Sequence, residues 1–254
     1  MLRRANFRYP SSSFCPQMYV TFWGLSNPSE VCLMLGKIVA IEGGDGAGKR
    51  TTSFAVADQL RGRGLKAAVI SFPRYGETVG ANVIGDYLAQ RLTLAMSPRT
   101  LAVYYAIDRF ESLEWIHRSQ EENDFVIMDR YVGSNVAYQG SKVVASDALA
   151  CMRWIERLEL EQFGVPAPNL SILLRMPVAQ AKRLVSMKST RSYTESVFDL
   201  HEADDELQRK IYESYSVLVR ESIVSAWMVV EPVVGEVLRE PGDIACEIVS
   251  ALCS

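Results

Sequence analysis

Short apolar runs alternate along this chain with longer stretches whose apolar residues recur every three or four positions. Apolar runs bounded by turn residues are typical of buried parallel strands, and the periodic stretches are typical of helices that cover a sheet. Strands are expected over residues 38–41, 66–72, 125–129, 170–174 and 227–230. The alternation predicts an α/β fold of the P-loop NTPase type, with a five-stranded parallel sheet and helices on both faces.

The helical pattern has recognisable boundaries at several places. Ser97 followed by Pro98 is a typical helix start, because serine caps the first turn and proline suits its first position. Gly164 ends another helix, and the polar stretch of about 186–198 lacks apolar periodicity. Helices are expected over residues 53–60, 78–92, 98–117, 146–163, 178–185, 199–225 and 243–252.

Residues 1–36 differ from the rest of the chain, because their prolines and serines show no regular apolar spacing. Arg3 and Arg4 are not followed by the continuous apolar segment of a signal peptide. We interpret this segment as an N-terminal extension, either a disordered tail or residues upstream of a start at Met34. Residues 37–254 are expected to form one domain.

Composition narrows the possible classes of protein. The chain has 254 residues, 48% of them hydrophobic, and a net charge of −3, which argues against nucleic acid or an anionic membrane as the main partner. No apolar run approaches membrane-spanning length. The five cysteines include no C-x-x-C pair, so we expect a reduced, cytoplasmic protein without a cysteine metal site.

The first strand leads into a glycine-rich loop, residues 43–52, and then into a helix. The spacing of Gly43, Gly48 and Lys49 is that of a phosphate-binding P-loop, in which backbone N–H groups and the lysine contact phosphates. Arg50 stands where the motif has Ser or Thr, so the usual hydroxyl for Mg²⁺ is missing. Thr51 lies about 100° further round the helix. The nucleotide-binding segment is expected to comprise Gly43, Gly44, Asp45, Gly46, Ala47, Gly48, Lys49, Arg50 and Thr51.

Other strand ends carry more charge. In a parallel sheet ligands bind at the carboxyl ends of the strands, where residues 72–75 and Asp129-Arg130-Tyr131 should lie. Arginines there suit two polyanionic phosphate chains. Asp129 follows four apolar residues, as a carboxylate that orients metal-bound water does. An ordinary strand-end cap is the alternative interpretation.

These motifs resemble those of the thymidylate kinases. The resemblance covers residue 37 to nearly the C-terminus and is most specific over residues 129–139, DRYVGSNVAYQ. It includes Asp45, residues 72–75 and the Tyr105-x-x-x-Arg109 pair. The sequence Gly48-Lys49-Arg50-Thr51 is found in a bacterial branch of that family. The resemblance implies transfer of a phosphoryl group from ATP to dTMP in dTTP synthesis, with Mg²⁺ as cofactor and a homodimer as the assembly.

The resemblance also implies roles at the base-binding end of the site. Tyr105 would stack on the thymine, and Arg109 would donate a hydrogen bond to a base carbonyl. Asn135 has both donor and acceptor groups and would read the N3–H edge, although a helix-start cap is equally compatible with its position. Phe72 and Ser134 are also expected among the substrate-binding residues.

Further roles are implied at the phosphate end. Asp45 would accept a bond from the 3′-OH or hold Mg²⁺ through water, and Tyr138 would exclude a ribose hydroxyl. Arg74 and Arg130 would bind the acceptor phosphate, and Tyr75 would contact the monophosphate or the metal shell. The catalytic set is then Lys49, Arg130, Arg191 and Asp129.

The polar stretch 186–198 would be a mobile lid over ATP. Thymidylate kinases with an arginine in the P-loop carry it beside the Asp45 position, but here that neighbour is Gly46. Arg191 is the only arginine between Arg183 and Arg209, so we expect it to meet the transferring phosphoryl group. Glu202 matches an acidic metal-side position, and a first-turn carboxylate favoured by the helix dipole is the alternative.

Two other functions remain open from the sequence. One is a P-loop kinase for another nucleoside monophosphate or a deoxynucleoside, and the other is a non-catalytic nucleotide-binding protein. A GTP switch usually carries an Asn-Lys-x-Asp motif, which the sequence lacks. The arginines expected of an active kinase are intact.

Overall fold

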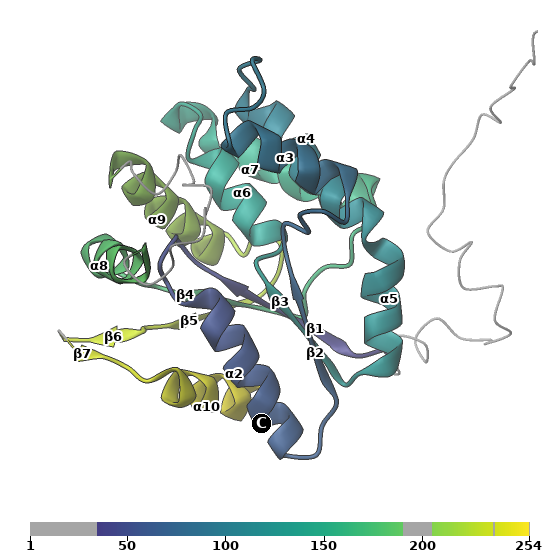
Figure 1. Ribbon diagram of the computed structural model, residues 1–254, viewed down its shortest axis with the longest axis vertical. Helices are drawn as coiled ribbons and strands as arrows, with labels where there is room; N and C mark the ends of the chain where they lie inside the picture. The colour runs from purple at the N-terminus through teal and green to yellow at the C-terminus, as the bar shows by residue number, and fades with distance from the viewer. Residues whose placement is uncertain (1–34, 190–204, 236, 254) are drawn as a thin grey trace, which may run out of the picture. The chain divides into compact units, whose positions relative to one another are not determined.

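A five-stranded parallel sheet forms the centre of the fold in a computed structural model that describes residues 35–189, 205–235 and 237–253 (Figure 1). The strand order is β2-β3-β1-β4-β5, so the P-loop strand β1 is central. All neighbouring strands pair in parallel. The strands are β1 (Lys37–Glu42), β2 (Ala67–Ser71), β3 (Phe125–Asp129), β4 (Leu170–Leu174) and β5 (Trp227–Val230).

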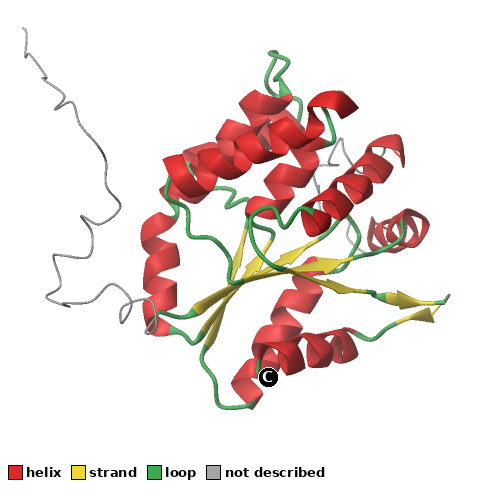
Figure 2. Cartoon of the chain, turned by 180° about the vertical axis from the view of Figure 1, so that it is seen from behind, coloured by secondary structure: helices red, strands yellow, loops and turns green. Residues whose placement is uncertain are grey.

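Helices cover both faces of the sheet, as Figures 1 and 2 show. Because side chains alternate along a strand, Ile38 and Ala40 face one core while Val39 and Ile41 face the other. The helices are α2 (Lys49–Gly62), α3 (Val79–Leu88), α4 (Pro98–Glu111), α5 (Leu113–Glu122), α6 (Val132–Gly140), α7 (Ala145–Arg157), α8 (Val178–Ser189), α9 (Asp205–Arg220) and α10 (Pro241–Leu252). Helices α2 and α10 belong to the second core, and α4, α6, α7 and α9 belong to the first.

The predicted sheet is confirmed, and the strand boundaries differ by one residue at most. A short antiparallel hairpin of β6 (Val233–Val234) and β7 (Val237–Leu238) was not expected. No helix among the described residues combines the length and apolar character needed to cross a membrane. Contacts divide the chain into Met1–Met34 and Leu35–Ser254. The described residues begin at Leu35, so the expected N-terminal extension, residues 1–36, lies almost wholly outside them.

Several expected helix boundaries are wrong. The single helix expected over 98–117 ends at Glu111, and α5 begins after Ser112. The Ser112 hydroxyl donates to the Asp108 carbonyl at 2.7 Å, a side-chain bond of the kind that bends helices. Helix α3 stops at Leu88, before Gln90, whose φ of 56° is left-handed.

Three later boundaries also differ. The helix expected over 146–163 is α7 followed by a π-helical turn, η2 (Leu158–Gln162). Helix α8 continues to Ser189 instead of ending at Val185, so the first residues of the predicted lid, 186–189, are helical. Helix α9 ends at Arg220 instead of Ser225, because Ser222 and Val224 adopt left-handed backbone conformations.

Helices α3 and α4 are held together by a buried carboxylate. Asp108 accepts a bond from the Thr78 hydroxyl at 2.6 Å and from the Arg74 backbone N–H at 3.2 Å. The Thr78 hydroxyl in turn accepts from Ala81 N, which caps α3. Burial raises the pKa of Asp108 despite these bonds. The arrangement joins the end of β2 to the helix that carries Tyr105 and Arg109.

The same helix pair generates a stability prediction at Gly80. A Cβ there would lie 2.5 Å from Asp108 N and 2.6 Å from Tyr104 O, both backbone atoms of α4. We expect Gly80→Ala to destabilise the protein by about 1–3 kcal/mol, because the helices must separate. The control is Gly62→Ala in α2, where no atom lies within 4 Å and a gain of up to about 1 kcal/mol is expected. Denaturant unfolding measures both, and equal stabilities for the two variants would contradict the prediction.

Candidate nucleotide-binding site

The P-loop joins β1 to α2 as the sequence predicted. Gly43 and Gly48 have φ values of 145° and 85°, and a Cβ at Gly43 would meet the Leu174 carbonyl at 2.8 Å. The Lys49 ammonium is buried and donates to the carbonyls of Gly43 at 3.0 Å and Gly44 at 2.6 Å. The loop therefore holds its lysine beside the concavity where phosphates bind in such loops.

The environment of Lys49 weakens its hold on a proton. Burial, and then the neighbouring charge of Arg130, lower the pKa of Lys49 to about 7, against an ordinary value of 10.5. The carboxylates of Asp45, Asp129 and Glu42 oppose the shift. An incoming polyanion would favour the charged ammonium.

Asp45 is the centre of a hydrogen-bonded group at the P-loop. It forms an ion pair with Arg130, accepts from the Tyr138 hydroxyl at 2.7 Å, and accepts from Gln208 Nε2 at 3.0 Å. Burial alone would raise the pKa of Asp45, but the charges of Arg130 and Lys49 hold it well below its ordinary value. Asp45 is therefore ionised and joins the P-loop to α6 and α9.

Arg130 reaches Asp45 because of its backbone. Its φ of 63° is left-handed, which is uncommon for a residue other than glycine, and its N–H donates to the Ile41 carbonyl at 3.1 Å. Such conformations cluster at functional sites. The adjacent Asp129 ends β3 and accepts from the Ser71 hydroxyl at 3.2 Å.

A cavity of about 300 Å³ opens beside this group, at the carboxyl ends of β1, β2 and β3. Its lining includes every substrate-binding residue predicted from the sequence except Arg74, together with Arg50 and Asp129. That set is Asp45, Phe72, Tyr75, Tyr105, Arg109, Arg130, Ser134, Asn135 and Tyr138. Residues far apart in the sequence therefore meet around one space, at the low end of the size range for small-molecule sites.

The end of the cavity away from the P-loop is lined by Arg109 and Asn135. Both are buried, and both bind the carboxylate of Glu159, which does not line the cavity. Burial opposes the charge of Arg109, but Glu159 raises the pKa of the guanidinium above its ordinary value. The alternative interpretation, that Asn135 caps a helix start, is not what the structure shows, because its amide donates to Glu159 and to the Ala102 carbonyl.

Arg74 lies outside the cavity lining. Its guanidinium donates to the Ser112 hydroxyl at 3.0 Å, pairs with Glu77, and stacks 3.8 Å from the centre of the Trp115 ring. Its Nε is buried and has no partner among the described residues. The predicted contact of Arg74 with the acceptor phosphate would need its side chain to turn from this position.

Two P-loop residues differ in exposure from the rest of the loop. Arg50 and Thr51 are exposed, and the Arg50 guanidinium lies 5.7 Å from the centre of the Phe54 ring. Among the residues that the structure describes, no group of three or more His, Cys, Asp or Glu could hold a metal ion. The predicted lid arginine, Arg191, and the predicted metal-side carboxylate, Glu202, lie outside the described residues.

Several residues that hold the site together were not expected from the sequence. Glu42 is fully buried and accepts bonds from Tyr131 N at 2.9 Å, the Ser134 hydroxyl at 2.6 Å and the Tyr215 hydroxyl at 3.1 Å. Burial raises the pKa of Glu42. An acidic residue at the end of an apolar strand was the available signal. Ser71, Glu159 and Gln208, which bind Asp129, Arg109 and Asp45, had none.

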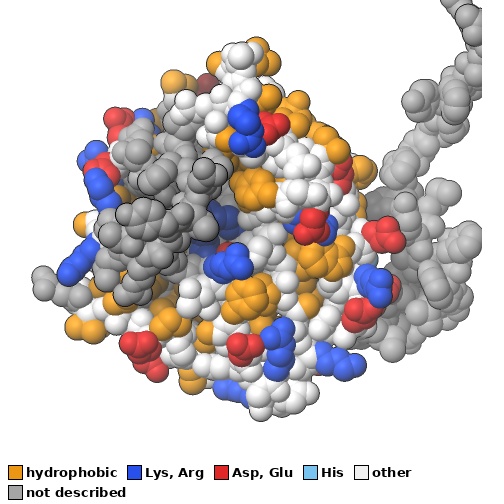
Figure 3. Space-filling model, viewed as in Figure 1, with side chains coloured by type: hydrophobic (Ala, Val, Ile, Leu, Met, Phe, Trp, Pro, Cys, Tyr) orange, Lys and Arg blue, Asp and Glu red, His pale blue; other side chains and the backbone are white. Residues whose placement is uncertain are grey.

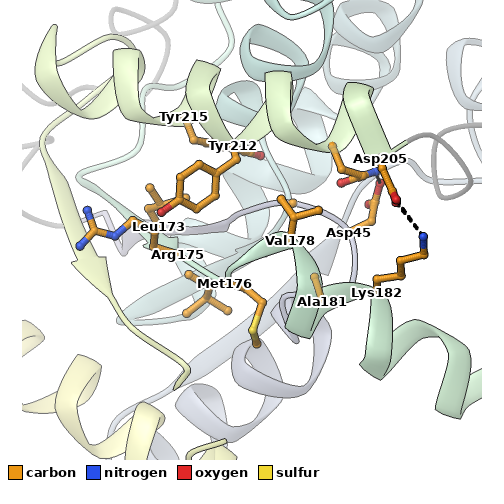
Figure 4. Close-up of a pocket in the computed structure, with 13 residues that line it drawn as sticks. Asp45, Leu173, Arg175, Met176, Val178, Ala181, Lys182, Asp205, Tyr212 and Tyr215 are labelled. Atoms are coloured by element: carbon orange, nitrogen blue, oxygen red, sulfur yellow. Dashed lines mark hydrogen bonds and ion pairs between the residues drawn. The ribbon is translucent and has the colours of Figure 1, made fainter. Parts of the chain in front are cut away.

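A second, smaller space lies between α8 and α9 (Figure 4). Its volume is about 50 Å³, and Asp45 lines it as well as the larger cavity. Figure 4 shows Val178 and Ala181 on α8 and Tyr212 on α9 around this space, and the ion pair of Lys182 with Asp205, whose atoms lie 2.9 Å apart. The space is far below nucleotide size as it stands.

A parallel sheet of this order with a P-loop at its centre and cations around an adjoining cavity defines the class of P-loop phosphotransferases. A solved thymidylate kinase from Candida albicans shares the fold, with a TM-score of 0.63 and 18% identity, over 86% of this chain and 93% of that one. The sequence model of the thymidylate kinase family matches residues 41–230.

Curated relatives agree with the family match. The chain is 32% identical over 194 residues to a thymidylate kinase of Mycobacterium tuberculosis, over 76% of this chain and 90% of the relative. It is also 30% identical over 208 residues to the thymidylate kinase of Leifsonia xyli, which covers 80% of this chain and 92% of that relative. The chain belongs to the thymidylate kinase family, whose members phosphorylate dTMP to dTDP with ATP as donor.

The lowered pKa of Lys49 predicts a dependence of stability on pH. The unfolded chain keeps this lysine protonated up to about pH 10, whereas the folded chain gains the proton only as pH falls through about 7. The contribution of Lys49 to stability is therefore present at high pH and lost as pH falls. From pH 9 to pH 6, the free energy of unfolding of the wild type should fall by roughly 2–3 kcal/mol relative to that of Lys49→Met. Denaturant unfolding across this range checks it, and parallel pH profiles would refute it.

Proposed function

We propose that the cavity binds dTMP, with its base between Tyr105, Arg109 and Asn135 and its phosphate towards Arg130, while the P-loop binds the phosphates of ATP. One observation carries this assignment. The predicted base-side and phosphate-side residues line one continuous space, and that space adjoins the P-loop through Asp45. Arg74 and Tyr75 would join the acceptor phosphate on binding, and Phe72 and Ser134 would bound the base.

The chemistry needs no general base, because the acceptor phosphate is already anionic at neutral pH. Catalysis then consists of aligning the acceptor oxygen with the γ-phosphorus and neutralising the charge on the transferring group. Arg130 is held towards the cavity by Asp45. Lys49 would exchange its bonds to the Gly43 and Gly44 carbonyls for phosphate oxygens, which would restore its charge. Asp129 would orient the metal-side water.

We expect a magnesium ion at this site. Mg²⁺ prefers oxygen ligands and usually takes one or two carboxylates, waters and substrate phosphates, so a cage of three acidic side chains is not required. Asp45 and Glu202 are the proposed protein contacts. When bound, the ion supplies charge neutralisation between the phosphates. Arg50, in place of the usual hydroxyl, lines the cavity and offers no metal ligand.

Other parts of the proposal rest on the sequence. We expect a homodimer. The helices that begin at Pro98 and Ala145 are candidate interface surfaces, and Leu149 on the second of them is exposed. A cytoplasmic location agrees with the absence of paired cysteine motifs. No nucleic-acid or membrane partner is expected. The face in Figure 3 mixes charged side chains of both signs with hydrophobic ones.

The P-loop assignment is tested by Lys49→Ala. We expect turnover of dTMP to fall at least about 100-fold, because a preorganised charge is removed from the transferring group. Lys210→Ala, which removes an exposed lysine paired with Glu206, serves as the control and should keep normal activity. A coupled assay of ADP release measures both variants. The same assay, run over a panel of nucleoside monophosphates, also distinguishes dTMP from other acceptors. Near-normal activity of Lys49→Ala would contradict the P-loop assignment.

The role proposed for the lid is tested by Arg191→Ala. Gly46 has no side chain to offer the γ-phosphoryl group, so a lid arginine would supply that charge. Turnover should fall at least about 100-fold with little change in dTMP affinity. Arg220→Ala, at an exposed arginine paired with Glu221, is the control. Steady-state kinetics with both substrates decide the matter, and wild-type turnover of Arg191→Ala would exclude the lid arginine.

A further inference from the structure

Glu159 is a fully buried carboxylate that does not line the cavity but binds two residues that do. It pairs with Arg109 through two hydrogen bonds, one from Nη2 to Oε1 at 2.7 Å and a second from Nε to Oε2. It also accepts from Asn135 Nδ2 at 2.7 Å. No other residue among those described binds both side chains at the base-binding end.

The π-helical turn η2 places Glu159 at this position. The turn follows α7, and within it Glu159 is fully buried while Glu161 and Gln162 are exposed. The N–H of Val165 donates to the Glu159 carbonyl at 2.9 Å, which closes the turn. Single π-helical turns within helices occur frequently at functional sites.

The partners of Asn135 determine which way its amide faces. Nδ2 lies 2.9 Å from the Ala102 carbonyl and 2.7 Å from the Glu159 carboxylate, and both of these groups accept hydrogen bonds only. The reversed amide would place an oxygen against two acceptors. The nitrogen must therefore face them, and Oδ1 is left buried without a partner among the described residues.

A buried acceptor without a donor is destabilising, so this oxygen is expected to gain a donor when the site fills. Arg109 carries the complementary group. Glu159 occupies its Nε and Nη2, so Nη1 is outside this ion pair, and a guanidinium can only donate. Both residues line the cavity, so together they can offer one acceptor and one donor to a base.

We propose that Glu159 is a positioning residue for base specificity, which orients Asn135 as an acceptor and Arg109 as a donor. The inference rests on the proposed dTMP site. Thymine has an N3–H donor beside a carbonyl acceptor and matches this pattern. Cytosine has an N3 that accepts hydrogen bonds and an amino group that donates them. Its N3 would therefore face the Asn135 oxygen, which is also an acceptor, and its amino group would face the Arg109 guanidinium, which is also a donor.

The test uses two substrates that differ only at this edge, dTMP and 5-methyl-dCMP. Both carry the 5-methyl group, so size does not distinguish them. The ratio of their kcat/KM values is measured on one enzyme preparation, which makes it independent of the fraction folded. We expect the wild type to prefer dTMP by about 10³-fold or more, because mismatched bases leave buried polar groups unpaired.

Glu159→Gln is the main variant. The replacement keeps the shape but introduces an NH₂ that must face the donors of Arg109 or Asn135. Preference for dTMP should fall at least about 10-fold, mainly through a raised KM for dTMP, while the KM for ATP stays nearly unchanged. Glu161→Gln, at an exposed site in the same turn, is the matched control and should keep the wild-type ratio.

Two further variants make the outcome decisive. Glu159→Asp keeps a group that only accepts hydrogen bonds. Its preference for dTMP should therefore stay within about threefold of wild type, even if the rates with both substrates fall. This variant also tests the proposal if Glu159→Gln does not fold. Asn135→Ala should lose preference and raise the dTMP KM roughly 10-fold. An equal fall for both substrates in Glu159→Gln, or lost preference in Glu159→Asp, would overturn the role of Glu159. If Asn135→Ala also kept its preference, base reading by the proposed site would fail as well.

Discussion

The site depends on the compensation of charges that are buried at the carboxyl edge of the sheet. A charged group that leaves water needs an opposite charge or hydrogen bonds, and otherwise it changes its protonation state. Asp45 with Arg130 and Glu159 with Arg109 are compensated as ion pairs. Lys49, whose hydrogen-bond partners among the described residues are two backbone carbonyls, has its pKa lowered to about 7. Lys49 is therefore the least compensated of these charges.

Buried ion pairs are weak evidence for stability, because the cost of removing both ions from water often equals their attraction. Here the ion pairs fix the positions of structural elements relative to one another. Each pair joins elements that are distant in the chain: Asp45 joins the P-loop to the end of β3, and Glu159 joins η2 to α4. Glu42 acts similarly through hydrogen bonds, since it binds α6 and α9 through hydroxyl and backbone donors. The cavity walls are thereby held before a nucleotide arrives.

Most of the fold could be predicted from the sequence, because each strand is an apolar run and each helix has apolar residues at every third or fourth position. The predicted boundaries that were wrong are those set by contacts between elements. Ser112 ends α4 by bonding the Asp108 carbonyl and Arg74, and nothing in the local sequence marks it as a break. The π-helical turn at Leu158 likewise follows an uninterrupted helical pattern.

The sequence by itself determined the P-loop, the parallel sheet, the family, and most of the residues that line the cavity, because these are carried by motifs at the ends of strands. Only the tertiary structure decided how those residues are held. The lowered pKa of Lys49, the turn of Arg74 away from the cavity, and the orientation of the Asn135 amide all depend on neighbours supplied by other elements. Burial and hydrogen-bond partners are properties of the packed chain, and no local pattern of residues encodes them.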